Sequence, residues 1–460
     1  MKTLFTQSFL VASLLTAILG AQSRVGFAAP SIATADQSTT TNRNPSGSEL
    51  IPAGLIQHVV VIFQENRTPD NLFHGLPNAD IADFGVDSKG KNIRLTPVKL
   101  ASNYDLDHDN EAYVKMYDGG KMNGADKIKV RCKKGVRGCP PHPQFKYVRR
   151  SDVLPYFQLA ETYTFGDRMF QTNQGPSFPA HQFIISGTSA PTATSDLFAA
   201  ENPSGVPHAT EQTGCTAPRQ EFVKLIDPQG KESHKMYPCF EHLTLPDLLD
   251  NAGISWRYYA PGAGSIWTGP NAISHLRFGP DWSKDVILDH KQVLRDIAQG
   301  QLADVSWVIP SGRQSDHAAI NDGSGPSWVA SVVNAVGGSQ YWTNTAIFIT
   351  WDDWGGWYDH VAPDIYDSYE YGFRVPLIVV SPYAKQSYVS HVTHDFGSIL
   401  KFIEELYGLP SLGYADARAD DLLDCFNFKQ APLSFHTIPA PYTAKHFLED
   451  KRPPTDPDDD

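Results

Sequence analysis

The sequence lacks an excess of positive charge and, beyond its first residues, it lacks long hydrophobic runs. Its 460 residues carry a formal net charge of −13, which argues against a nucleic-acid partner because phosphate backbones require a basic surface. A small phosphate ester needs only a local positive site and is still compatible with this charge. No stretch after residue 29 is apolar for long enough to cross a membrane. We therefore expect neither a nucleic-acid partner nor a transmembrane segment.

Cysteine is scarce as well, and the five cysteines are unevenly spaced. Cys132 and Cys139 form one close pair, Cys215 and Cys239 form a second, and Cys425 is left over. In an oxidising compartment the spacing suggests a disulfide within each pair, although sequence alone leaves the connectivity open. A metal clip at the first pair is the alternative, but no further Cys or His ligand lies at a suitable spacing.

Residues 1–29 have the pattern of a secretory signal peptide. Lys2 supplies the positive end, residues 9–19 form the apolar core, and small residues follow. The core is too short to span a bilayer comfortably, and the absence of a twin arginine favours the general secretory route. We expect the mature protein to be periplasmic or secreted.

The rest of the chain divides into one large domain between two polar ends. Residues 30–50 are rich in Ser, Thr and Asn, which is typical of a flexible linker. Residues 431–460 end in PPTDPDDD, and we expect a disordered acidic tail there. Residues 51–430 remain for the globular domain, in a chain that is 41% apolar overall and long enough for a large core.

Four apolar runs have the length and composition of strands that are buried on both faces of a sheet. They cover residues 56–63, 303–310, 346–351 and 374–380. Helical patterns lie between such runs, and right-handed crossovers would then assemble the strands side by side. The sequence predicts an α/β fold with a mostly parallel central sheet flanked by helices.

Polar side chains follow two of these strands directly. Glu65 and Asn66 come after the first strand, and Asp352 and Asp353 come after the third. Open α/β sheets bind ligands at the carboxyl ends of their strands, and adjacent carboxylates repel each other unless a cation binds them. The alternative at each place is a solvated loop with an acid that points to water.

Ser177 follows a turn at Gly175 and Pro176 and precedes a run that could continue as a helix. One interpretation is that this serine is a helix N-cap. The same geometry would also place a hydroxyl beside free backbone N–H groups and a positive dipole end, which favour an anionic phosphate. The residues alone leave both interpretations open.

These motifs together resemble those of the bacterial phosphoesterase family that includes acid phosphatases and non-haemolytic phospholipases C. The stretch HVVVIFQENRTPDNLFHGLP, residues 58–77, is similar to the family's ENRSFD-type opening motif. The resemblance recurs to about residue 410, through DLDH at 105–108, GGKMNG at 119–124, GPSFPAH at 175–181, the Asp-His pair at 316–317 and WDDWGGWYDHV at 351–361.

The resemblance implies an alkaline-phosphatase-like architecture and assigns roles to particular residues. It makes Ser177 the nucleophile and places His108, His317 and His360 around the phosphate. It also implies one divalent metal ion, held by Glu65, Asn66, Ser177, Asp352 and Asp353. Oxygen ligands favour Mg, Ca or Mn, and zinc is a further possibility.

The chain departs from the family pattern in places. Ala180 replaces the usual Asn, which puts any contact of that amide in doubt, whereas His181 keeps the last position of the motif. Ala318 and Ala319 stand where the family has prolines. His394 lies at a histidine position of a later helix and either assists the site or caps that helix.

The function implied is that of a secreted, metal-dependent phosphoesterase, a hydrolase that cleaves phosphate esters through a serine. Ser rather than Thr at residue 177, the lack of a twin-arginine signal and the lack of extra C-terminal modules lean towards acid phosphatase. The alternative is a phospholipase C that cleaves phosphatidylcholine-type lipids, so the partner is a small phosphate ester or a phospholipid headgroup. An inactive secreted binding protein is the alternative from another class, and the intact set of acids argues against it.

Overall fold

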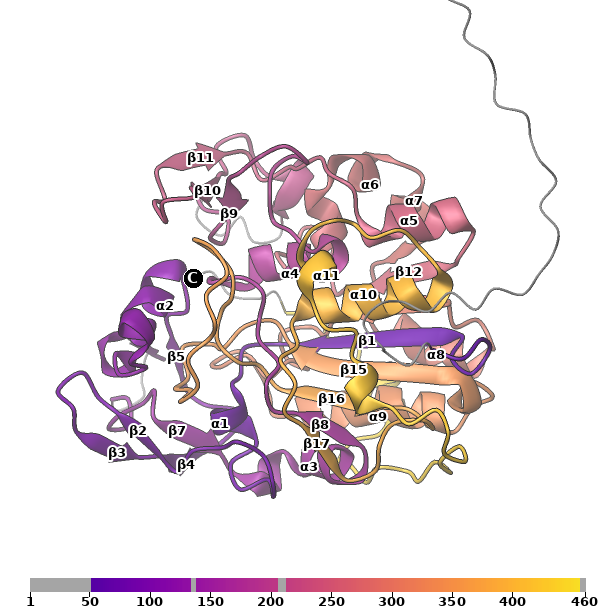
Figure 1. The fold of residues 1–460 in the computed structure, drawn as a ribbon, viewed down its shortest axis with the longest axis horizontal. Helices are drawn as coiled ribbons and strands as arrows, with labels where there is room; N and C mark the ends of the chain where they lie inside the picture. Colours follow the sequence, from indigo (N-terminus) through magenta and orange to yellow (C-terminus); the bar gives the residue numbers. More distant parts are fainter. Residues whose placement is uncertain (1–50, 134–137, 206–211, 456–460) are drawn as a thin grey trace, which may run out of the picture. The chain divides into compact units, whose positions relative to one another are not determined.

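An eight-stranded sheet runs through the centre of the fold (Figure 1). Five of its seven neighbouring pairs are parallel, and only β16 runs antiparallel to both of its neighbours. The expectation of an α/β fold with a mostly parallel sheet is confirmed. The strands lie in the order β13 (Val286–Ile287), β12 (Trp256–Tyr259), β14 (Val305–Val308), β1 (His58–Gln64), β15 (Thr345–Trp351), β16 (Leu377–Val380), β8 (Thr164–Gly166) and β17 (Tyr388–Ser390).

The computed structural model describes residues 51–133, 138–205 and 212–455. These residues belong to one compact unit, which begins at Glu49. The expected signal peptide, residues 1–29, and the expected linker, residues 30–50, lie outside the described residues. None of the helices in the described ranges combines the length and apolar composition that a bilayer span requires.

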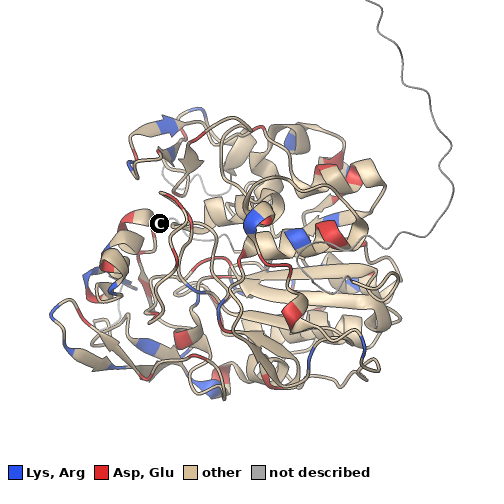
Figure 2. Cartoon of the chain, viewed as in Figure 1, with Lys and Arg blue, Asp and Glu red and all other residues tan. Residues whose placement is uncertain are grey.

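The four strands expected from sequence lie next to one another, as β14, β1, β15 and β16. Their side chains are almost entirely buried because both faces of the sheet are covered. In Figure 2 these central strands are tan, without Lys, Arg, Asp or Glu, and the charged residues lie on helices, loops and outer strands. Gln64 pairs with Trp351 at the last position of the β1–β15 ladder, so the residues that follow both strands leave the sheet together.

Helices cover both faces of the sheet. Phe348 on β15 packs on Phe402 of α10, with ring centroids 5.0 Å apart, and Trp351 packs on Tyr156 of α3 at 5.2 Å. Positions three apart on a strand point to opposite faces, so these helices lie on opposite sides. The helices are α1 (Pro69–Leu72), α2 (Asn110–Tyr117), α3 (Leu154–Thr162), α4 (Ser177–Ser186), α5 (Leu245–Ala252), α6 (Ser274–Phe278), α7 (Asp281–Lys284), α8 (Gln292–Ala298), α9 (Gly325–Gly337), α10 (Phe396–Tyr407), α11 (Ala415–Arg418) and α12 (Ala444–Glu449).

Short strands outside the central sheet form small ribbons on connecting segments. Both expected disulfides are confirmed, with Cα–Cα distances of 5.7 Å for Cys132–Cys139 and 4.5 Å for Cys215–Cys239, and Cys425 is buried and free. The ribbons consist of β2 (Phe84–Val86) with β3 (Asn92–Arg94), β4 (Thr96–Val98) with β7 (Lys146–Val148), β5 (Tyr104–Leu106) with β6 (Val130–Cys132), and β9 (Phe198–Ala199) with β10 (Val223–Ile226) and β11 (His234–Met236).

The expected disordered tail at residues 431–460 is wrong for the part up to residue 455. Phe447 of α12 is 1% exposed and packs on Trp328 of α9, with ring centroids 5.4 Å apart. Arg313 donates a hydrogen bond to the carbonyl of Pro453 at 2.6 Å. Apolar residues of this segment therefore join the core. The sequence prediction relied on the acidic residues at the end of the segment and overlooked the apolar residues before them.

The packing of α12 predicts a loss of stability on truncation of its anchor. Phe447→Ala should lower the free energy of unfolding by about 3 kcal/mol, because a buried aromatic side chain is lost and a cavity remains. Tyr442→Ala is the control, since Tyr442 is 42% exposed, and it should cost less than about 1 kcal/mol. Urea unfolding of the two variants checks this; equal effects would mean that α12 does not belong to the core.

Candidate functional site

The ends of β1 and β15 are tied to each other by Asn66. Its backbone N–H donates to Asp352 Oδ1 at 3.0 Å, and its side-chain Nδ2 lies 3.1 Å from both carboxylate oxygens of Asp353. Asn66 has a φ of 62°, a left-handed conformation that Asn tolerates better than most residues. Glu65, Asn66, Asp352 and Asp353 are all buried, so the polar cluster expected at this edge of the sheet is present.

Ser177 joins this cluster from the N-terminus of α4. Its Oγ lies 3.3 Å from Asp353 Oδ2 and 3.5 Å from Glu65 Oε2. Ser177 is the first helical residue, with Pro176 at the N-cap position, so its hydroxyl does not cap the helix. It is instead directed at two carboxylates, beside the positive end of the α4 dipole.

His181 is a member of the cluster to which the sequence interpretation gave no role. Its Nε2 lies 3.2 Å from Glu65 Oε1, and its Nδ1 lies 3.2 Å from the Tyr258 hydroxyl. Burial lowers the pKa of His181 to about 4, which leaves a neutral imidazole, the form that binds metals. The spacing between Ser177 and His181 could have identified His181 from the sequence, because residues four apart on a helix lie on the same face.

The electrostatics of the cluster favour a bound cation. Burial, together with the charge of Asp352, raises the pKa of Glu65 and of Asp353 well above the usual range. Asp352 Oδ2 and Asn66 Oδ1 are buried and accept no hydrogen bond from the described residues. Ligand atoms of Glu65, His181 and Asp352 lie within 4.8 Å of one another. Carboxylate and amide oxygens with one imidazole fit a divalent metal ion.

The structure places His108 against the cluster and His317 beside His108. His108 Nε2 lies 3.1 Å from Asn66 Nδ2 and 4.0 Å from Asp353 Oδ2. Its Nδ1 lies 2.9 Å from the Leu106 carbonyl, which assigns the proton to Nδ1 in the neutral ring. The ring of His317 lies 5.7 Å from that of His108, centroid to centroid.

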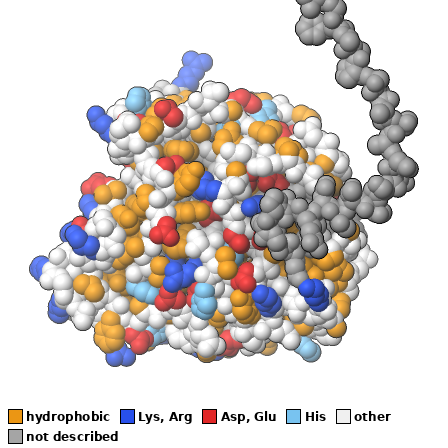
Figure 3. Space-filling view, in the orientation of Figure 1, with side chains coloured by type: hydrophobic (Ala, Val, Ile, Leu, Met, Phe, Trp, Pro, Cys, Tyr) orange, Lys and Arg blue, Asp and Glu red, His pale blue; other side chains and the backbone are white. Residues whose placement is uncertain are grey.

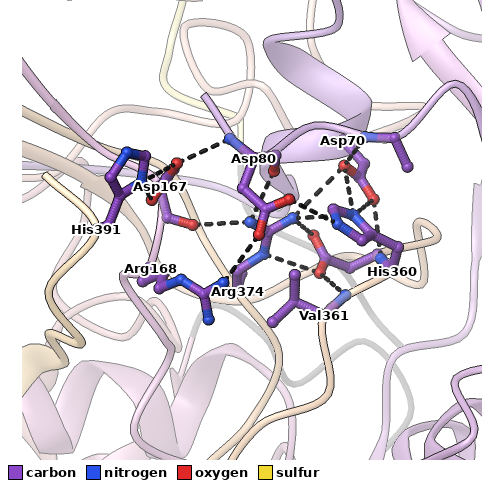
Figure 4. A network of polar contacts seen from close by, with 10 residues as sticks. Asp70, Asp80, Asp167, Arg168, His360, Val361, Arg374 and His391 are labelled. Atoms are coloured by element: carbon purple, nitrogen blue, oxygen red, sulfur yellow. Dashed lines mark hydrogen bonds and ion pairs between the residues drawn. The ribbon is translucent and has the colours of Figure 1, made fainter. Parts of the chain in front are cut away.

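The prediction that His360 lies beside the same cluster is wrong. Its Nδ1 lies 2.8 Å from Asp70 Oδ2 and its Nε2 lies 3.0 Å from Asp80 Oδ1, so carboxylates engage both ring nitrogens (Figure 4). The same network contains Arg374, whose guanidinium bonds Asp359. This arginine supplies the positive charge that a metal ion would otherwise provide.

The chain turns away from the cluster just before His360 because of two glycines. Gly355 and Gly356 have φ values of 62° and 71°, which disfavour other residues. A Cβ on Gly355 would lie 2.5 Å from the carbonyl oxygen of Asn66. The glycines therefore let the segment pass close to the β1 end and then leave it.

Comparisons with known proteins agree with the resemblance in the motifs. The model of the phosphoesterase family matches residues 56–410. Phospholipase C A of Mycobacterium tuberculosis (strain H37Rv) is 24% identical over 447 residues, covering 82% of this chain and 78% of that protein. Non-hemolytic phospholipase C of Pseudomonas aeruginosa (strain PAO1) is 24% identical over 441 residues, covering 81% of this chain and 57% of that protein.

Solved structures are similar over comparable lengths. A protein in the alkaline phosphatase superfamily from Vibrio parahaemolyticus covers 80% of this chain and 71% of its own, with 11% identity and a TM-score of 0.37.

The contacts of His360 predict a pH dependence of stability. Burial lowers its pKa, but the Asp70 carboxylate more than offsets this and raises the pKa to about 9. Protonated His360 stabilises the fold fully at pH values below the pKa of histidine in the unfolded chain, which is about 6.5. The stabilisation is lost as pH rises through the folded-state pKa of about 9. We expect the free energy of unfolding to fall by on the order of 2 kcal/mol between pH 6 and pH 10 through this group.

His360→Gln is the variant that isolates this contribution from other titrating groups. The difference in unfolding free energy between wild type and variant should shrink as pH rises from 7 to 10. Denaturant unfolding at a series of pH values measures it, and a constant difference would show that His360 is not protonated in the network.

Proposed function

The chain belongs to the phosphoesterase family and is a hydrolase of phosphate ester bonds, and we propose that it acts on phosphate monoesters, as acid phosphatases do, with Ser177 as the nucleophile. One observation carries the proposal: the Ser177 hydroxyl lies at a helix N-terminus, 3.3 Å from Asp353 and 3.5 Å from Glu65. The carboxylates are within reach of its proton, and the helix dipole favours the anionic phosphate at the same place.

In the proposed reaction the Ser177 oxygen attacks phosphorus in line with the leaving alcohol. Its proton passes to a neighbouring carboxylate, the Oγ–P bond forms, and the P–O bond to the alcohol breaks. The imidazolium form of His108 or His317 protonates the departing oxygen from Nε2, since Nδ1 of each ring faces a backbone carbonyl. Water then attacks the phosphoserine and gives a proton to that imidazole, the Oγ–P bond breaks, and the carboxylate returns its proton to Ser177 Oγ as phosphate leaves.

A metal ion in this site would be held by Glu65, Asn66, Ser177, Asp352 and Asp353. When bound, it would lower the pKa of the serine hydroxyl and neutralise charge on the phosphoryl oxygens. His181 adds an imidazole to this set, since its Nε2 faces Glu65 from one turn further along α4. The two disulfides support a secreted or periplasmic location, where thiols are oxidised.

Phospholipase C activity is the second candidate, and the relatives named phospholipase C favour it. The test is a side-by-side assay of the purified protein on p-nitrophenyl phosphate and on phosphatidylcholine vesicles. Faster release of phosphate from the monoester supports the first proposal. Release of phosphocholine without monoester turnover supports the second, and turnover of neither substrate supports an inactive binding protein.

Replacement of Ser177 tests the nucleophile. Ser177→Ala should lower kcat on p-nitrophenyl phosphate by about 10⁴-fold or more, because no covalent intermediate can form. Ser186→Ala is the matched control on the same helix, since its hydroxyl bonds the carbonyls of Gln182 and Thr188 and lies 3.1 Å from His242 Nε2, none of which belongs to the cluster, and it should keep kcat within a few-fold. Near-normal turnover by Ser177→Ala would instead indicate that water attacks phosphorus directly.

Removal of one acid tests the metal site through stability as well as activity. Asp352→Asn should lower affinity for Mg²⁺ or Mn²⁺ by about tenfold or more and lower turnover with it. In the presence of EDTA the variant should melt at a higher temperature than wild type, because one buried carboxylate no longer repels two others. With the metal added, the order should reverse, since the wild type gains more from binding. An unchanged order in calorimetry would contradict a cation at this place.

A further inference from the structure

A small cavity lies directly beside the cluster that contains Ser177. It has a volume of about 130 Å³, and His108 and Pro176 are among the residues that line it. His108 contacts Asn66 of the cluster, and Pro176 immediately precedes Ser177. A phosphate at Ser177 would therefore direct one of its ester groups towards this cavity.

Asn202 connects the cavity to the helix that carries Ser177. Its Oδ1 accepts a hydrogen bond from the backbone N–H of Phe178 at 2.9 Å, so its Nδ2 group is the part left to donate elsewhere. No hydrogen bond from this Nδ2 to another described residue is present, and Asn202 lines the cavity. The cavity therefore has an oriented amide donor next to the phosphate position.

The Arg and Lys side chains that line the cavity both form ion pairs within the protein. Arg131 Nη2 lies 3.0 Å from Asp107 Oδ1, and Lys224 Nζ lies 2.9 Å from Glu232 Oε2. Burial, and next the neighbouring Glu232, raise the pKa of Glu201 well above the usual range, which favours the protonated acid. The lining thus offers hydrogen-bond donors and acceptors without a strong net charge.

The lining also argues against two kinds of ester group. None of the nine residues that line the cavity is Phe, Tyr or Trp, whereas quaternary ammonium groups are recognised by aromatic faces. Eight of the nine are polar, so an acyl chain in the cavity would displace water from these polar side chains and would gain almost no apolar contacts in return. On the face drawn in Figure 3, hydrophobic side chains are interspersed with polar and charged ones.

We propose that this cavity binds the alcohol part of the substrate and that this part is a small polyhydroxylated alcohol, such as a glycerol or sugar unit. Each hydroxyl both donates and accepts, which matches the Asn202 amide, the Glu201 acid and the carboxylate oxygens of Asp107 and Asp109. The inference rests on the proposed phosphoesterase function and narrows its substrate class. The polyol is either a free phosphate ester or the headgroup of a phospholipid.

The first test uses the wild-type protein and substrates matched in size. The kcat/KM for glycerol 3-phosphate should exceed that for n-propyl phosphate and for phosphocholine by about tenfold or more. The latter two have no hydroxyl groups to form hydrogen bonds with the polar side chains that line the cavity. A ratio of one, or a preference for either competitor, would overturn the proposal. If p-nitrophenyl phosphate is also not hydrolysed, the proposed function fails rather than the subsite alone.

Vesicles separate the two sources of the polyol. Hydrolysis of phosphatidylglycerol in preference to phosphatidylcholine would assign the subsite to a lipid headgroup. Hydrolysis of glycerol 3-phosphate without either lipid would assign it to a free ester. A preference for phosphatidylcholine would contradict a polyol subsite.

Asn202→Asp separates substrate binding from helix capping. The carboxylate keeps an acceptor for the Phe178 N–H and suits a helix N-terminus, so the melting temperature should stay unchanged. The amide donor is lost, so the ratio of kcat/KM for glycerol 3-phosphate over n-propyl phosphate should fall towards one. Because the new carboxylate repels the phosphate of both substrates alike, this repulsion cancels in the ratio. If Asn202 only capped α4, the ratio would stay unchanged.

Glu201 provides a second, matched pair of variants. Glu201→Gln keeps a donor and an acceptor in the same volume and should preserve at least half of the wild-type ratio. Glu201→Met removes both and should lower the ratio about tenfold or more. Equal ratios for the two folded variants, checked by circular dichroism, would contradict a hydrogen bond from Glu201 to the alcohol.

Discussion

The burial of three carboxyl groups at the ends of two neighbouring strands is the constraint on which the site depends. Glu65, Asp352 and Asp353 are fully buried within the same cluster, where like charges repel and water is excluded. Asn66 offsets part of this cost with its backbone and side-chain N–H groups. A cation would offset the rest, which explains why the raised pKa values and unpaired oxygens occur at the same place.

Rigid supports hold this unfavourable arrangement in position. Arg67 follows Asn66 and donates from Nε to the carbonyl of Asp316 at 2.9 Å. The carboxylate of Asp316 accepts from Trp351 at 3.0 Å and from Tyr156 at 2.8 Å. The residue that precedes His317 is thereby tied to the end of β1, to the end of β15 and to α3. These contacts fix the backbone that carries His317, whose ring lies 5.7 Å from that of His108, centroid to centroid.

Two networks of buried acids illustrate how a protein balances such charge in different ways. Around Asp70 and Asp359 the balance comes from Arg374 and a protonated His360, so every member has a partner within the chain. In the part of the chain that the structure describes, no Lys or Arg side chain forms an ion pair with Glu65, Asp352 or Asp353. The acids and the histidine of both networks lie close enough to hold a metal ion, and a cation fits the second network better because the first already contains Arg374.

The sequence by itself determined the strands, their adjacency and the residues that end them. Buried β-branched runs followed at once by acids carry this information locally. The short spacing between cysteines suggested both disulfides, and the structure confirmed which cysteines pair. The motifs also identified the histidines at 108 and 317 that flank the cluster.

Only the tertiary structure decided which further residues join. His360 belongs to the Asp70 network because a glycine turn and the distant Arg374 direct it there, and neither effect is visible in its own motif. His181 and Asn202 enter the site through helix geometry and through a loop about 25 residues away from Ser177, and α12 joins the core through Trp328. Such contacts depend on segments far apart in the chain, whose approach is set by packing and not by local pattern.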